Sequence, residues 1–205
     1  MTREAHWQNV YTTKAPDAVS WFQPRAALSL RFIAEAGLPP AAPIIDVGAG
    51  ASRLVDGLLA LGHQDLTLLD VSDAALAVTR ARLGPQAAGV TFLSGDATTV
   101  PLPAARYALW HDRAVFHFLT EAAERAAYLA QLRRALTADG QVVIATFAED
   151  GPEKCSGLPV RRYRATELAA ELGADFELCA HDREQHATPF GTTQSFTYCR
   201  FRRRA

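Results

Sequence analysis

The chain has 205 residues, of which 49% are hydrophobic and 21% are charged, and its formal net charge is -1. This composition excludes a largely disordered protein, and the length predicts one globular domain rather than two. Apolar runs stay shorter than the roughly 18 residues that a membrane span needs, and the near-neutral charge argues against a protein that coats nucleic acid.

The first 39 residues are predicted to form a helical cover, and residues 40–205 a core sheet with helices, within a single domain of residues 1–205. A helical pattern runs from about Arg25 to Ala36, and Gly37 suits the left-handed position that follows a helix. The Pro-rich segment 37–43 then gives the clearest break in the chain.

After this break, strand-like and helix-like segments alternate, which predicts a parallel sheet with helices on both faces. Strands are expected at 44–47, 66–69, 90–93, 107–110 and 141–147, where short runs are apolar or β-branched. Helices are expected at 52–61, from an N-cap at Ser72 to Leu83, from an N-cap at Thr120 to about 136, and at 166–172. The last two β-rich runs, 176–184 and 194–201, should pair as an antiparallel hairpin because no helix fits between them.

An acidic residue closes or follows each of the first four expected strands. In an open parallel sheet, ligands bind beyond the carboxyl ends of the strands. Carboxylates gathered there repel one another unless a ligand or hydrogen-bond donors occupy the site, so a ligand with positive charge and hydroxyl groups would fit. The four strand ends read Asp46-Val47-Gly48-Ala49-Gly50-Ala51-Ser52, Asp70-Val71, Gly95-Asp96-Ala97 and His111-Asp112-Arg113.

The glycine turn after the first strand discriminates between two kinds of nucleotide ligand. Gly48 and Gly50 let the backbone approach a ligand, but Arg53 stands where a dinucleotide fingerprint has its third glycine. Asp70 lies 20 residues after Gly50, where a carboxylate can accept both hydroxyls of a ribose. Asp46 would repel a pyrophosphate and suits a ligand with an amino group. An NAD-dependent oxidoreductase is therefore only an alternative.

These motifs resemble those of class I S-adenosylmethionine-dependent methyltransferases, and within that class the small single-domain bacterial enzymes. The resemblance rests on Asp46-x-Gly48-x-Gly50, Asp70, Gly95-Asp96-Ala97 and the terminal hairpin, and it covers about residues 40–204. It implies an α/β fold with a Rossmann-like, doubly wound, seven-stranded sheet in the order 3-2-1-4-5-7-6, whose final strand is antiparallel. It also implies S-adenosyl-L-methionine as the cofactor and S-adenosyl-L-homocysteine as the product.

The resemblance assigns parts of the cofactor to particular residues. Asp46 and the glycine turn are expected beside the methionine part, Asp70 at the ribose, and Asp96 at the adenine amino group. Ser52 stands where many members have a third glycine, but serine is small enough to fit there and can cap the following helix. The expected cofactor-binding residues are Asp46, Gly48, Ala49, Gly50, Ser52, Asp70, Val71, Asp96, Ala97 and His111.

The exit of the fourth strand fronts the methyl acceptor in this family. His111 and Asp112 are the candidate catalytic residues, and a histidine there could act as a general base because its ordinary pKa lies near neutrality. Arg113 is expected either to hold an anionic acceptor or to form an ion pair with Asp112. His117 could contact the acceptor or pack inside a helix. A metal site is not expected, because His111 and His117 lack the spacing of one helix face.

Aromatic residues near the N-terminus allow two interpretations. Tyr11 and Trp21 could border the acceptor, since aromatic faces attract the sulfonium cation of the cofactor, or they could pack the N-terminal segment on the sheet. The polar segment 148–157 is expected to overhang the acceptor pocket. The expected substrate-binding residues are Tyr11, Trp21, Arg113 and His117.

The sequence as a whole predicts transfer of a methyl group to a nucleophilic N, O or S atom of a small-molecule acceptor. A protein side chain such as lysine is the alternative acceptor, and a non-catalytic binding module is the alternative outside enzymes. Nucleic acid ranks last, because the arginines at residues 200–204 are the only sign of a basic groove and no Asn-Pro-Pro-Tyr-like motif follows the fourth strand. The three cysteines form no C-x-x-C pair, which favours a reduced cytoplasmic protein. No membrane partner is expected, and the protein is expected to be a monomer or weak homodimer.

Overall fold

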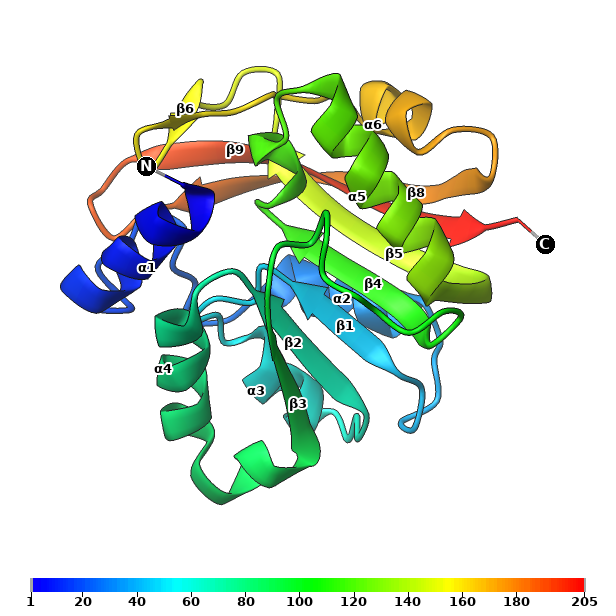
Figure 1. The fold of residues 1–205 in the computed structure, drawn as a ribbon. Helices are drawn as coiled ribbons and strands as arrows, with labels where there is room; N and C mark the ends of the chain where they lie inside the picture. The colour runs from blue at the N-terminus through cyan, green and yellow to red at the C-terminus, as the bar shows by residue number, and fades with distance from the viewer. Residues whose placement is uncertain (1, 205) are drawn as a thin grey trace.

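A computed structural model describes residues 2–204 of the chain. In this range seven strands form one sheet in the order β3-β2-β1-β4-β5-β9-β8, with helices on both faces (Figure 1). Counted within this sheet alone, the order is 3-2-1-4-5-7-6, and β9 pairs antiparallel with both of its neighbours. The predicted topology is therefore confirmed. The strands are β1 (Ile44–Val47), β2 (Leu66–Asp70), β3 (Val90–Ser94), β4 (Tyr107–Arg113), β5 (Leu136–Phe147), β8 (Phe176–Ala187) and β9 (Thr193–Arg203).

The helices form two layers, and each layer encloses its own buried apolar cluster against the sheet. One layer consists of α2 (Ala27–Glu35), α3 (Leu54–Ala60) and α4 (Asp73–Leu83), and the other of α5 (Ala122–Ala135) and α6 (Ala165–Leu172) (Figure 1). The predicted cap of α4 is confirmed, because the Ser72 hydroxyl accepts a hydrogen bond from the Ala75 N–H at 3.2 Å. Of the helices within residues 2–204, none combines the length and the apolar character that crossing a bilayer requires.

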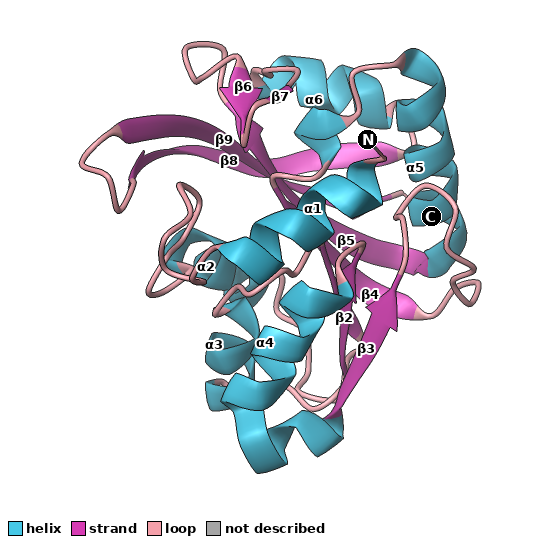
Figure 2. Ribbon diagram, turned by 60° about the vertical axis from the view of Figure 1, so that its left-hand side comes forward, coloured by secondary structure: helices cyan, strands magenta, loops and turns pink. Residues whose placement is uncertain are grey.

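A further helix, α1 (Arg3–Thr13), lies beside α4 near the carboxyl ends of the central strands (Figures 1 and 2). Its N-cap is Thr2, whose hydroxyl accepts from the Ala5 N–H. Gln8 fastens the helix to the start of α4, since its amide oxygen accepts from the Ser72 hydroxyl at 3.0 Å and from the Ala74 N–H at 3.3 Å. Helix α1 therefore covers one end of the sheet.

Four local predictions need correction. Strand β5 begins at Leu136 rather than at the predicted residue 141. Helix α5 begins after Glu121 rather than after an N-cap at Thr120, because the Arg125 guanidinium donates to the carbonyls of Leu119 and Thr120 and holds this segment as a turn. Strand β4 continues beyond the predicted end at Trp110. The segment expected to be a loop contains a short hairpin of β6 (Lys154–Cys155) and β7 (Leu158–Pro159).

Because β4 continues past Trp110, its polar residues His111 and Asp112 alternate between the two faces of the sheet. Successive side chains of a strand point to opposite faces of the sheet. Leu109 packs in the cluster under α2 and α3, whereas Trp110 packs in the cluster under α5. His111 therefore faces the same side as Leu109, while Asp112 faces α5, where the Tyr128 hydroxyl donates to it at 2.6 Å.

Candidate active site

A cavity lies beneath α1 at the carboxyl ends of the central strands, where an open parallel sheet binds its ligands. It holds roughly 1240 Å³ of empty space, its open mouth included. The structure brings most of the predicted site residues to its wall, namely Tyr11, Trp21, Asp46, Gly48, Ala49, Ser52, Asp70, Val71, Asp96, Ala97, His111 and Arg113. Within residues 2–204, three predicted positions lie outside this lining: Gly50, Asp112 and His117.

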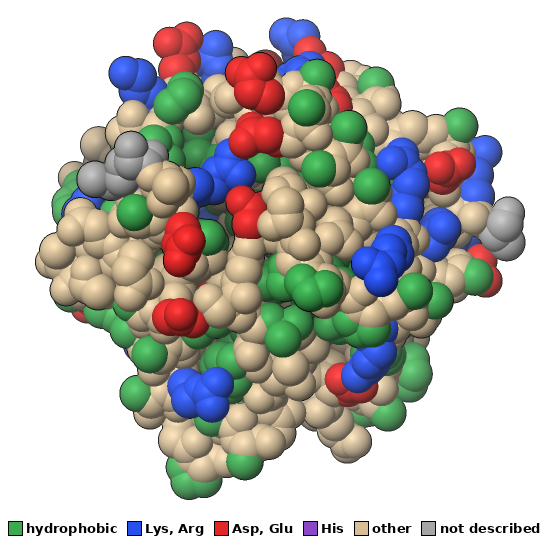
Figure 3. All heavy atoms as spheres, viewed as in Figure 1, with side chains coloured by type: hydrophobic (Ala, Val, Ile, Leu, Met, Phe, Trp, Pro, Cys, Tyr) green, Lys and Arg blue, Asp and Glu red, His purple; other side chains and the backbone are tan. Residues whose placement is uncertain are grey.

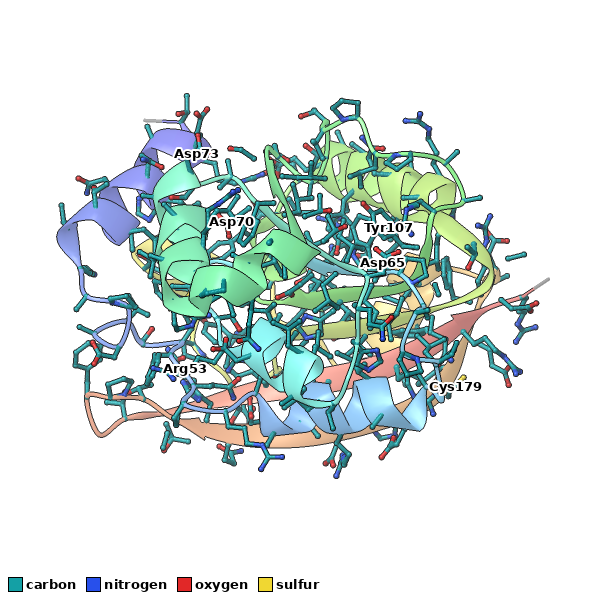
Figure 4. All side chains as sticks on the ribbon, turned by 90° about the horizontal axis from the view of Figure 1, so that it is seen from below. Arg53, Asp65, Asp70, Asp73, Tyr107 and Cys179 are labelled. Carbon is teal, nitrogen blue, oxygen red and sulfur yellow. The ribbon has the colours of Figure 1, made fainter. Side chains whose placement is uncertain are left out.

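Asp70 is the buried carboxylate at the end of β2. One of its oxygens accepts from the Gly50 N–H and the other from the Ser72 N–H, both at 2.8 Å. Burial raises the pKa of Asp70 to about 6, although these N–H donors act in the opposite direction. Figure 4 shows Asp70 inside the fold and Asp73 further out, at the start of α4. Asp70 is thus held in a fixed orientation, with acceptor capacity left for hydroxyl donors in the cavity.

The glycine turn has no room for side chains. Gly48 has φ +67°, and a Cβ there would lie 2.0 Å from a Val115 methyl carbon. Gly50 has φ +51°, and a Cβ there would lie 2.4 Å from the Tyr11 hydroxyl oxygen. The Ser52 hydroxyl accepts from the N–H of Leu54 at 3.1 Å, but the N-cap position of α3 is Arg53, so Ser52 fixes the turn before the helix rather than capping it. The backbone at Gly48 lines the cavity directly.

Asp96 follows β3 and contributes a third carboxylate. One oxygen accepts from the Thr98 N–H at 2.8 Å and from the Thr98 hydroxyl at 2.6 Å. The other lies 3.5 Å from the Arg3 guanidinium, which also binds Glu124 at 2.6 Å. Helix α1 therefore contacts the adenine end of the expected cofactor site through Arg3.

Asp46, His111 and Ser29 form a hydrogen-bonded row at the other end of the cavity. The Nδ1 of His111 lies 2.6 Å from an Asp46 oxygen, and its Nε2 lies 2.9 Å from the Ser29 hydroxyl. All three side chains are buried, and all three line the cavity. Sequence reasoning missed Ser29, because it lies 82 residues from His111 on α2 and no motif connects the two.

Arg113 forms the rim of the cavity beside the hairpin of β8 and β9. Its guanidinium donates to the Tyr198 hydroxyl at 2.8 Å, to the Trp21 carbonyl at 3.1 Å and to Glu184 at 3.2 Å. The expected ion pair with Asp112 is wrong, because neighbouring residues of β4 face opposite sides of the sheet. Since Glu184 already neutralises Arg113, an anionic acceptor gains little from this cation.

Asp112 lies behind the cavity wall, which argues against its predicted catalytic position. It accepts hydrogen bonds from the Tyr128 hydroxyl at 2.6 Å, from the Val115 N–H at 2.9 Å and from the Phe116 N–H at 3.0 Å. Burial raises the pKa of Asp112 to about 6, despite these donors. The arrangement is that of a structural carboxylate, which fixes the turn after β4.

His117 likewise packs inside the fold rather than at the cavity. Its ring lies against Phe118 and Phe147, and its Nδ1 accepts from the Phe147 N–H at 3.3 Å. Burial, with a smaller effect from Arg113, lowers the pKa of His117 to about 3, so the ring is neutral near pH 7. The alternative in which His117 packs inside the protein thus agrees with the structure, although the segment is a 3₁₀ turn, Phe116–Phe118.

Aromatic side chains form one wall of the cavity. The ring of Trp7 meets those of Trp21 and Phe118 edge to face, with centroids 5.5 Å and 5.2 Å apart. The Trp21 indole N–H donates to the Tyr11 hydroxyl at 3.3 Å, which places Tyr11 above Gly50. Cys155 also lines the cavity, but burial raises its pKa to about 12, so the thiol stays protonated near pH 7.

Comparison with known proteins shows a methyltransferase-domain match and methyltransferase-like structures. The chain superimposes on a 1,6-didemethyltoxoflavin-N1-methyltransferase of Burkholderia thailandensis with a TM-score of 0.70 and 24% identity, covering 96% of this chain and 82% of that one. A SAM-dependent methyltransferase of Anabaena variabilis gives a TM-score of 0.75 at 16% identity, covering 98% and 93%. Residues 44–140, which hold the glycine turn and the acidic strand ends, match the family model described as a methyltransferase domain. The chain thus contains a match to a methyltransferase-domain family, and its fold is that of solved SAM-dependent methyltransferases.

The curated relatives that the chain matches are much longer. The chain is 24% identical to the mouse eEF1A lysine and N-terminal methyltransferase over 139 residues, which make up 67% of this chain and 19% of that protein. The chain therefore spans about a fifth of the length of the curated relatives that it matches.

Proposed function

We propose that the protein transfers the methyl group of S-adenosylmethionine to a nucleophilic N, O or S atom of a small-molecule acceptor and releases S-adenosylhomocysteine. The observation that carries this proposal is the meeting of three strand-end carboxylates, Asp46, Asp70 and Asp96, with a glycine turn and an aromatic wall around one cavity. S-adenosylmethionine has an ammonium group, a ribose diol and an adenine amine, which match three separated acceptors.

Each carboxylate has a part of the cofactor to bind in this proposal. Asp70 accepts hydrogen bonds from the ribose hydroxyls, and Asp96 accepts from the adenine amino group beside Ala97. Asp46 attracts the ammonium group, while the backbone at Gly48 makes room for the methionine part. Ala49, Ser52 and Val71 complete the walls, because all three line the cavity.

When bound, S-adenosylmethionine supplies a methyl group that its sulfonium already activates. The protein therefore needs mainly to align the acceptor and to keep water out. Trp7, Trp21 and Tyr11 do this from α1 and the segment that follows it, and their ring faces also favour a neighbouring cation.

The shape of the cavity favours a small acceptor. Its acceptor end is enclosed by residues 16–26 and by the rim at Arg113, so an acceptor must enter an aromatic pocket rather than lie on a surface. Lys and Arg side chains are interspersed with Asp and Glu on the face seen in Figure 3, which gives that face no advantage in binding nucleic acid. The toxoflavin methyltransferase with the same fold is named for a small-molecule substrate.

A protein acceptor is the second candidate, and the matching mouse protein supports it because its name specifies lysine and N-terminal methylation. The two candidates differ in the size of the product. Incubation of a cell extract with radiolabelled S-adenosylmethionine and the protein should put label into small molecules, and label confined to polypeptides would favour the second candidate.

Calorimetric titration with S-adenosylmethionine tests the donor part of the proposal. The wild-type protein should bind in the micromolar range, and Asp70→Ala should weaken binding at least tenfold because two hydrogen bonds to a charged group are lost. Asp73→Ala is the matched control: Asp73 is exposed, lies three residues away, and should leave the affinity unchanged. Lack of binding at millimolar ligand, or equal affinities for both variants, would refute the proposal.

A further inference from the structure

The row Ser29–His111–Asp46 has the connectivity of a Ser-His-Asp triad within a methyltransferase cavity. Asp46 comes from β1, His111 from β4 and Ser29 from α2, so three separate elements converge on one imidazole ring. The two contacts, 2.6 Å and 2.9 Å, are within normal hydrogen-bond length. The three side chains are only 0–4% exposed, so they are shielded from bulk water. A proton in this row therefore passes from one of these side chains to the next.

The direction of these hydrogen bonds follows from their partners. An ionised carboxylate can only accept, so Asp46 requires the proton of a neutral His111 to lie on Nδ1. The Nε2 atom then carries a lone pair and accepts from the Ser29 hydroxyl. In this arrangement the Ser29 oxygen has lone pairs left for another proton, as the hydroxyl of a nucleophile–base pair does.

We propose that Ser29 relays a proton from the methyl acceptor to His111, with Asp46 as the residue that positions His111. The inference rests on the proposed function and deepens it, because only a protic acceptor such as a hydroxyl or thiol needs such a relay. The Ser29 oxygen takes the acceptor proton as Ser29 passes its own to Nε2. The acceptor's freed electron pair forms the new bond to carbon while the carbon–sulfur bond breaks toward sulfur. The imidazolium formed is neutralised by Asp46 and returns its proton to water after product release.

The charged surroundings of the row are compatible with this role. On the β4 side, Asp112 lies close enough to interact electrostatically with His111. Beyond Ser29 lies Tyr198 of β9, whose hydroxyl accepts from Arg113 and donates to Glu184. Arg113 is also paired directly with Glu184, so this cation is neutralised beside the row.

Kinetics with acceptors of graded acidity test the relay. Purified protein, radiolabelled S-adenosylmethionine and a panel of substituted phenols and thiols would be assayed from pH 6 to pH 10. We expect Ser29→Ala to lower kcat by a factor of about 100 or more for weakly acidic acceptors, which is typical of lost general-base catalysis. The defect should shrink for acceptors already ionised in solution, and Ser29→Thr, which keeps the hydroxyl, should recover activity. A loss that is equal for all acceptors and at every pH would show a merely structural role and overturn the proposal.

A second measurement needs no acceptor. In ¹⁵N NMR spectra of histidine-labelled protein with S-adenosylhomocysteine, His111 should carry its proton on Nδ1, and Ser29→Ala should shift the Nε2 resonance. A proton on Nε2 would overturn the relay, because His111 would then donate to Ser29 and could not accept from it. Calorimetric titration of Ser29→Ala with S-adenosylmethionine separates the two proposals. Affinity within about threefold of wild type leaves the donor site intact, whereas failure of the wild type to bind refutes the proposed function itself.

Discussion

Asp70 and Asp112 lie on β2 and β4, the two strands that flank β1. They have similar surroundings, but only Asp70 lines the cavity. Both are buried, and burial raises the pKa of each to about 6. Each also accepts hydrogen bonds from two backbone N–H groups of nearby turns. They differ in what their remaining lone pairs face. Those of Asp70 face the cavity, whereas Asp112 accepts a further hydrogen bond from the Tyr128 hydroxyl. A buried acid with a raised pKa therefore marks a binding site only where its remaining lone pairs face open space.

The largest expected difference between Asp70 and Asp112 is the loss of stability when each is replaced by alanine. Asp112→Ala leaves the Tyr128 hydroxyl and two backbone N–H groups buried without partners, so we expect a loss of about 2–4 kcal/mol in the free energy of unfolding. Asp70→Ala should cost less than about 2 kcal/mol, because water in the cavity can replace the carboxylate. Urea denaturation at pH 7.5 measures both. Equal losses in the free energy of unfolding for the two variants would contradict this difference between Asp70 and Asp112.

The pH dependence of stability provides a second comparison. The pKa of Asp112 is about 6 in the folded protein, above the ordinary value of 3.8 expected in the unfolded chain, so the folded protein binds the proton more tightly. The free energy of unfolding should therefore fall as pH rises from about 4 to about 6, by up to roughly 3 kcal/mol for this one group, and then level off. Asp112→Asn should make this fall shallower, and so should Asp70→Asn, in urea titrations at pH 4.5, 5.5 and 6.5.

Addition of S-adenosylmethionine should then distinguish the two acids. Ribose hydroxyls that donate to Asp70 favour its ionised form, so the ligand should reduce the contribution of Asp70 to the pH dependence. The contribution of Asp112 should not change. If the ligand alters the pH dependence of Asp70→Asn as much as that of the wild type, Asp70 is not the carboxylate at the ribose.

The smallest effect is expected at Asp96, the third strand-end carboxylate. Its ion pair with Arg3 is long, at 3.5 Å, and both side chains are about one-third exposed. Arg3→Ala, which also removes the ion pair with Glu124, should lower Tm by no more than about 3 °C, because partly exposed ion pairs contribute under about 1 kcal/mol each. Arg204→Ala, which removes an exposed arginine near the other end of the chain, is the control for lost charge. A shift above 6 °C would show that α1 depends on this contact.

The half of the site where we propose that the cofactor binds was predictable because local sequence specifies it. Asp46, Gly48, Gly50 and Asp70 sit directly at the ends of short apolar strands, and parallel strands bring their carboxyl ends to one edge. The same rule placed Asp112 at the site because the fourth strand was predicted to end at Trp110. The strand continues to Arg113, so alternation turns Asp112 toward α5 and leaves His111 at the cavity.

The acceptor half depends on contacts that a single sequence does not reveal. Ser29 meets His111 across 82 residues, and Arg113 meets Tyr198 across 85. Helix α1 has one fully buried residue, Val10, so it lacks the continuous apolar stripe that identifies a helix by its periodicity. The capping error at Thr120 has a similar cause, since the turn is fixed by the side chain of Arg125 from within the helix.

Helix α1 and the segment after it bring one wall of the cavity from outside the sheet. The range that matches the family model, 44–140, holds Asp46, Asp70 and Asp96, whereas Trp7, Tyr11, Trp21 and Ser29 precede it. Replacing the residues before β1 by those of a relative cuts no strand of the sheet, so we expect it to change the acceptor preference more than the affinity for S-adenosylmethionine. Acceptor preference can thus change at the start of the chain around an unchanged sheet.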